Sequence, residues 1–191
     1  MKRLLTIAAS IALVAAVGVG YAGAQDYGGG HQGQSHGKKS NRFKGLRESQ
    51  SSLSAYLTGK AEVNDDGEDG AGDPNAKGTA SFLVADERTL CYGFAIRGAD
   101  EPNAVHIHKG VAGKNGDIVI PFDNPPKDAE GQPAGDPGAS SGCKVLEEES
   151  ELAALRRILS NPKGYYVNIH TASFPDGAVR GQLSRMLYDN D

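Results

Sequence analysis

The feature that most constrains this chain is a two-residue alternation of apolar and polar side chains that recurs along much of its length. In the first such run, Leu53, Ala55 and Leu57 alternate with Ser54, Tyr56 and Thr58. This period is typical of a β-strand with one buried face. Similar runs, separated by clusters of Gly, Asp, Asn and Pro, bring the expected strands to seven; the other six are residues 79–85, 90–97, 104–109, 117–122, 165–171 and 178–187.

The strand count predicts an all-β fold, an antiparallel Greek-key-like β-sandwich of about seven or eight strands. One short helix interrupts the pattern. Leu152, Leu155 and Leu159 lie three and four residues apart, acidic residues precede them, and Pro162 follows. This spacing is typical of one apolar helix face, and proline ends a helix.

The first 24 residues resemble a secretory signal peptide. Two basic residues precede an apolar run over residues 4–19, and Ala22-Gly23-Ala24 supplies the small residues that a signal peptidase accepts. The run is shorter than a typical membrane span. We therefore expect a signal peptide at 1–24, a flexible Gly/His/Gln-rich leader at 25–46 and one β domain at 47–188. The protein would be secreted or extracytoplasmic, at the cell surface or in the periplasm, without a membrane span after cleavage.

The charge of the chain argues against one class of partner. It has 20 basic and 24 acidic residues, a formal net charge of −4. A nucleic-acid-binding protein needs a basic excess to neutralise phosphates. We therefore expect no nucleic-acid partner, and instead an extracellular protein, a glycan or a cell-wall ligand.

Two cysteines, Cys91 and Cys143, are present. In an exported chain an even pair most simply forms one disulfide, with two buried thiols as the alternative. We expect the Pro-rich loop at 121–142 to be a surface excursion that brings Cys143 to the strand of Cys91 without a defined register. The acidic loop at 64–75 lacks EF-hand spacing and is interpreted as a solvated turn.

Three histidines are the candidate metal ligands. His106 and His108 are two residues apart in an expected strand, so they share one face. His170 lies in another strand, on the same face as Asn168 and Tyr166, which are candidate partners of the ligands. If the two strands are neighbours, the three imidazoles can hold zinc or copper, the possible cofactors. The alternative is that these histidines make only structural hydrogen bonds.

Glu62 and Arg180 are the candidates for a structural ion pair. Each lies among alternating strand residues, where an unpaired buried charge is costly. A buried pair would tie the first strand to the last; the alternative is an exposed arginine.

Five motifs, in order, resemble the CHRD domain, a family named for chordin and found in exported microbial proteins. They are Leu57, Gly59, Glu62 and Val63; Gly78, Ala80 and Phe82; VHIHKGVAGKNG from Val105; YYVNIHT from Tyr165; and Gly177 with Arg180 to Leu183. The resemblance covers about residues 47–187. It implies a β-sandwich-like extracytoplasmic module in a family without a generally established enzymatic activity.

Two functions remain open. The first is a secreted, non-catalytic binding or structural module. The second is a metal-binding protein that uses His106, His108 and His170, with redox or hydrolytic activity as a further possibility. No G-x-S-x-G motif is present, so no catalytic residue is assigned and we expect no enzyme. Outside the leader the chain has only three histidines, too few for the two-metal site of a copper/zinc superoxide dismutase.

Overall fold

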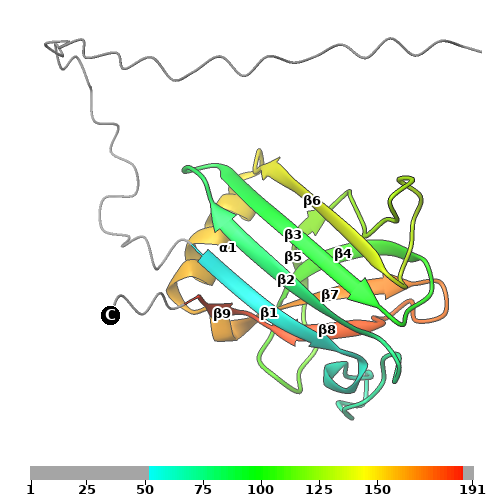
Figure 1. Cartoon of the computed structure of the whole chain (residues 1–191). Helices are drawn as coiled ribbons and strands as arrows, with labels where there is room; N and C mark the ends of the chain where they lie inside the picture. Colours follow the sequence, from blue (N-terminus) through cyan, green and yellow to red (C-terminus); the bar gives the residue numbers. More distant parts are fainter. Residues whose placement is uncertain (1–51, 187–191) are drawn as a thin grey trace, which may run out of the picture. The chain divides into compact units, whose positions relative to one another are not determined.

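The computed structural model describes residues 52–186 (Figure 1). The expected signal peptide and leader lie outside these residues, so both stay predictions. Among residues 52–186, no helix is long and apolar enough to span a membrane.

The described residues form nine strands and one α-helix. The strands are β1 (Ser52–Thr58), β2 (Lys77–Val84), β3 (Thr89–Arg97), β4 (Pro102–Lys109), β5 (Ile118–Phe122), β6 (Gly138–Val145), β7 (Tyr165–Thr171), β8 (Val179–Gln182) and β9 (Ser184–Arg185). The helix is α1 (Glu149–Ser160), and two short 3-10 turns are η2 (Gly59–Ala61) and η3 (Pro162–Gly164). The expected all-β class is confirmed.

All strands belong to one antiparallel sheet in the order β5-β4-β7-β8-β1-β2-β3-β6, with β9 paired to β1. The sheet folds over so that β1, β2, β3 and β6 form one layer and β5, β4, β7 and β8 form the other (Figure 1). The layers join where β8 meets β1, at the pair Thr58 and Arg180. The expected sandwich is thus made from a single folded sheet.

The core lies between these two layers and contains the apolar side chains of each alternating strand. Phe82, Phe94 and Phe122 pack with ring centroids 5.2–5.8 Å apart, and Tyr92 joins them. The apolar face of α1 completes the core through Leu152, Leu155, Ile158 and Leu159. The helix expected from the leucine spacing is confirmed.

Strand β6 was not expected. Residues 138–142, assigned to the end of the Pro-rich loop, pair with β3, and Cys143 lies directly opposite Cys91. The sequence GASSGCKV has small residues and one large apolar side chain, so it carries no alternation of the kind that predicts a strand.

The expected disulfide is confirmed, with the Cα atoms of Cys91 and Cys143 3.8 Å apart. The expectation that Cys143 reaches the strand without a defined register is wrong, since strand pairing sets its register.

The strand expected at 178–187 is divided. It forms β8 and β9, separated by Leu183, whose buried side chain contributes to the core. The acidic loop folds back on itself, with Val63 bridged to Asp69 and with the Asn64 side chain hydrogen-bonded to the backbone and side chain of Glu68. Its acidic residues 65–69 are exposed, as expected for a solvated turn, but Asp73 in the same loop is buried and its backbone N–H donates to Ala178 O.

Candidate metal centre

Polar side chains gather on the outer face of the β4-β7-β8 part of the sheet. They come from positions that alternate with core residues such as Ile107, Val167 and Ile169. Strand register aligns them in rows across the three strands: His106 with Asn168 and Arg180, and His108 with Tyr166 and Gln182. Because β4 and β7 are neighbours, the condition for histidine convergence is met.

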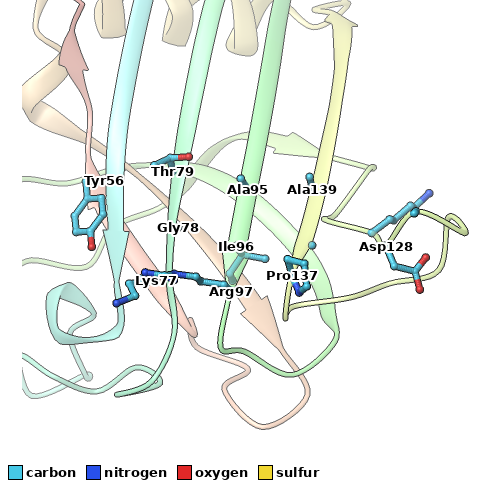
Figure 2. A pocket seen from close by; sticks show the side chains of 13 residues that line it. Tyr56, Lys77, Gly78, Thr79, Ala95, Ile96, Arg97, Asp128, Pro137 and Ala139 are labelled. Atoms are coloured by element: carbon cyan, nitrogen blue, oxygen red, sulfur yellow. The ribbon is translucent and has the colours of Figure 1, made fainter.

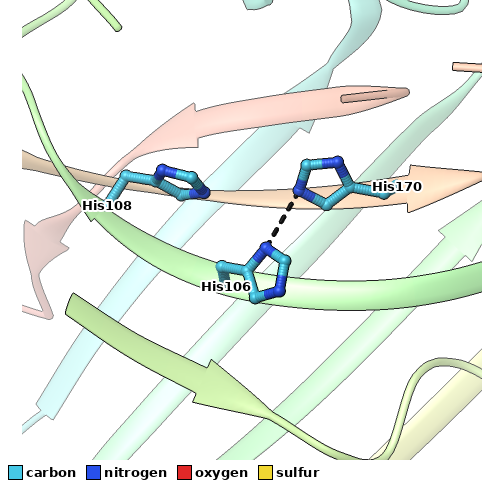
Figure 3. Close-up of side chains that lie close together, drawn as sticks. All are labelled: His106, His108 and His170. Carbon is cyan, nitrogen blue, oxygen red and sulfur yellow. Dashed lines mark hydrogen bonds between the residues drawn. The ribbon is translucent and has the colours of Figure 1, made fainter. Parts of the chain in front are cut away.

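The three histidines meet at one point (Figure 3). His106 Nδ1 lies 3.1 Å from His170 Nε2, and one nitrogen from each of His106, His108 and His170 lies within 4.8 Å of the others. His108 and His170 are 8% and 9% exposed, and His106 is half-buried. The structure therefore brings together all three histidines that the alternation of side chains along the strands made candidate metal ligands.

Backbone carbonyls fix the orientation of two of the rings. His108 Nδ1 donates to Gly116 O at 2.9 Å, and His170 Nδ1 donates to Pro175 O at 2.8 Å. In each neutral ring the Nε2 atom then carries the lone pair. A ligating histidine in a metal site is held in the same manner, through its other ring nitrogen.

The Nε2 atom of His108 is buried and has no partner at hydrogen-bond geometry, and the Asn168 side chain is near enough to raise the pKa of the ring. A buried polar atom without a partner is costly and calls for an explanation. By contrast, His170 Nε2 accepts a hydrogen bond from His106 Nδ1 at 3.1 Å. His108 therefore presents a free lone pair beside two further imidazole nitrogens.

The environment keeps all three imidazoles neutral. Burial, reinforced by the nearby His170 and His108, lowers the pKa of His106 to about 4. Burial also lowers the pKa values of His108 and His170, against the hydrogen bonds from their Nδ1 atoms, which raise them. Neutral imidazole is the form that binds a metal.

A stack of side chains supports His108 from the neighbouring strands. The rings of His108 and Tyr166 are parallel within 8°, with centroids 4.8 Å apart. The guanidinium carbon of Arg180 lies 3.4 Å from the centroid of the Tyr166 ring. Such a contact is a cation–π interaction. Tyr166 thus contacts His108 by stacking.

Arg180 also holds the loop at residues 110–117, which supplies Gly116 O to His108. It donates to Asn115 Oδ1 at 3.0 Å, to Val111 O at 3.1 Å and to Lys114 O at 2.7 Å. These residues lie within the motif VHIHKGVAGKNG, but the motif does not show that they accept hydrogen bonds from Arg180, since that role depends on the path of the loop.

The expected ion pair between Glu62 and Arg180 is corrected by the structure. Both side chains are buried, 2% and 1% exposed. Within residues 52–186, however, no ion pair joins Glu62 to Arg180. The reason is that the loop at 110–117 takes the hydrogen bonds of the guanidinium.

Glu62 instead lies against Gly177, whose missing Cβ leaves room for the carboxylate, and its Oε2 atom has no hydrogen-bond partner. Desolvation raises the pKa of Glu62 to about 7, although the nearby Arg180 lowers it.

A family model for the CHRD domain matches residues 53–183 of the chain. The chain belongs to the CHRD domain family. The match confirms the resemblance seen in the five motifs, and it spans the described strands β1–β8 and the three histidines. Membership supports the interpretation of this CHRD protein as a non-enzymatic module.

A superoxide dismutase 5 variant of Candida albicans is similar in structure, with a TM-score of 0.43, 14% sequence identity, and coverage of 74% of this chain and 96% of that one. No curated protein matches the chain in sequence.

Proposed function

We propose that this CHRD protein is a non-catalytic, extracytoplasmic binding module that holds one zinc or copper ion between His106, His108 and His170. The observation that carries the proposal is the buried, unpartnered Nε2 atom of His108 beside the other two imidazoles. A metal ion is the ligand that uses the lone pairs of three neutral histidines at once.

The distances support this donor set. A zinc–nitrogen bond of about 2.0 Å places the nitrogens of a tetrahedral site about 3.3 Å apart. The 3.1 Å between His106 and His170 is near that value, whereas the largest separation in the set, up to 4.8 Å, must shorten. Metal binding therefore replaces the hydrogen bond between His106 and His170 and draws His108 toward them.

The choice between zinc and copper follows from the ligand type. Three imidazoles suit both ions, and the described residues add no thiolate, because both cysteines are in the disulfide. The fourth position is left for water or a ligand atom from a partner. The secretory signature in the sequence and the disulfide support a location where cysteines are oxidised.

Thermal unfolding tests the proposal with the full, tag-free chain. Zinc or copper added to metal-free protein should raise the melting temperature by binding the folded state, and His108→Ala should remove that rise. Because the chain has two more histidines in its leader, the control is His31→Gln/His36→Gln, which should keep the rise.

The measured quantity is the metal-induced change, so a lower melting temperature of metal-free His108→Ala does not affect the test. An unchanged rise in His108→Ala, or its loss in the leader control, would contradict the proposal.

A further inference from the structure

A trough crosses the outer face of the other layer, which is formed by β1, β2, β3 and β6. Strand register defines its floor as one continuous row, in which Tyr56 pairs with Thr79, Thr79 with Ala95, Ala95 with Ala139, and Ala139 with Lys127. Figure 2 shows Thr79, Ala95 and Ala139 side by side, with Tyr56 beyond one end of the row and Asp128 beyond the other.

The shape of the trough comes from the sizes of these residues. The small side chains in the middle leave a hollow of about 630 Å³, and the larger residues at both ends form its walls. Tyr56 is 65% exposed, which is unusual for a tyrosine on a sheet face. Its ring is thus free to contact a ligand that lies in the trough.

Positive charge lines the trough. Lys77 and Arg97 lie along one side and Lys127 at one end. Within residues 52–186, none of these three cationic side chains makes a hydrogen bond or an ion pair. The acidic residue of the trough, Asp128, uses its Oδ1 atom in its own turn, where it accepts from the backbone of Glu130 and Gln132.

Lys77 and Arg97 are directly opposite each other in neighbouring strands. Like charges at such positions destabilise a sheet. Here they lie in a chain with a net negative charge and without an acidic partner between them. An anionic ligand that contacts both would relieve the repulsion and gain charge-assisted hydrogen bonds.

The direction of the trough limits the kind of ligand. A peptide that binds a sheet usually pairs with the backbone of an edge strand. This trough runs across paired strands, whose backbone groups already bond to each other. The row spans four strand spacings, about 19 Å. The ligand is therefore an extended molecule that brings its own polar groups to side chains.

We propose that this trough binds an acidic polysaccharide, with sugar carboxylates on Lys77 and Arg97 and a sugar ring against Tyr56. Hydroxyl and carboxylate groups suit the polar side chains, and the flat apolar face of a sugar suits an exposed aromatic ring. The chain's own segment at 25–51 is a poor occupant, because it has five basic and two acidic residues.

Titration calorimetry with tetragalacturonate tests the proposal. The full chain is used in EDTA, so that the result does not depend on the metal site. The neutral methyl ester of the same oligosaccharide is the ligand control. We expect binding of the acid form, at least tenfold weaker binding of the ester, and at least a tenfold loss in Lys77→Gln/Arg97→Gln.

The control variant Arg156→Gln/Lys163→Gln removes two exposed charges elsewhere and should bind as the original chain does. Equal binding of ester and acid, or an unchanged affinity in Lys77→Gln/Arg97→Gln, would overturn the proposal. Tighter binding of an oligoglutamate peptide than of tetragalacturonate would overturn the carbohydrate assignment. A concentration-dependent dimer that blocks binding of the oligosaccharide would assign the trough to a second copy of the chain.

Discussion

Removal of the Arg180 side chain should destabilise the fold and loosen the candidate metal centre together. Arg180→Ala removes three hydrogen bonds from a cation to the loop at 110–117, and it leaves two backbone carbonyls and Asn115 Oδ1 without these donors. Each such loss costs about 1–1.5 kcal/mol, and the cation–π contact with Tyr166 adds about 1 kcal/mol. We expect the free energy of unfolding to fall by about 4–5.5 kcal/mol.

Urea unfolding at neutral pH, extrapolated linearly to water, measures this change. Arg180→Lys is the matched control: it keeps a positive charge but loses the planar fork, so it should fall between the original chain and Arg180→Ala. A loss below about 1 kcal/mol in Arg180→Ala would refute the reasoning. Because Gly116 O belongs to the same loop, the metal-induced rise in melting temperature should also shrink in Arg180→Ala.

Two other changes give clear expectations. The pKa of Glu62 is raised from 4.5 in the unfolded chain to about 7 in the folded one. Between pH 4.5 and pH 7 the folded chain therefore holds a proton on Glu62 that the unfolded chain has released. The free energy of unfolding falls as the pH rises through this range. Glu62→Gln mimics the neutral carboxyl group, so it should raise the free energy of unfolding by up to about 3 kcal/mol at pH 8 and change it little below pH 4.5. Urea unfolding at several pH values measures this difference. A stabilisation by Glu62→Gln that does not grow with pH would contradict the expectation. Loss of the disulfide in Cys91→Ser/Cys143→Ser should cost about 4 kcal/mol in the chain-entropy model, because the bond closes a loop with a sequence separation of 52 residues. Equal urea midpoints for the oxidised chain and this variant would contradict that estimate.

The sequence predicts most strands of the fold because each buries large apolar side chains on one face only. Strand β6 could not be predicted in this way, since its small residues form a strand without an alternation of apolar and polar side chains. Its pairing with β3 becomes visible only through the opposition of Cys91 and Cys143.

For the candidate site, the alternation of side chains along a strand predicts correctly that His106 and His108 share a face. Because β4 and β7 are neighbours in the sheet, His170 joins these two histidines. The same alternation predicts that Asn168 lies on the face of His170, but it cannot predict the partner of a long side chain such as Arg180. The guanidinium of Arg180 bonds to the loop at 110–117 because that loop folds over the face, and the path of a loop has no period in sequence.

Elemental analysis tests most directly whether the three histidines of this CHRD domain bind one metal ion. The tag-free chain is loaded with zinc or copper and then dialysed exhaustively. We predict one ion per chain in the original protein and in His31→Gln/His36→Gln, and none in His106→Ala/His108→Ala/His170→Ala. No retained metal in the original chain, or the same content in the triple variant, would contradict the account.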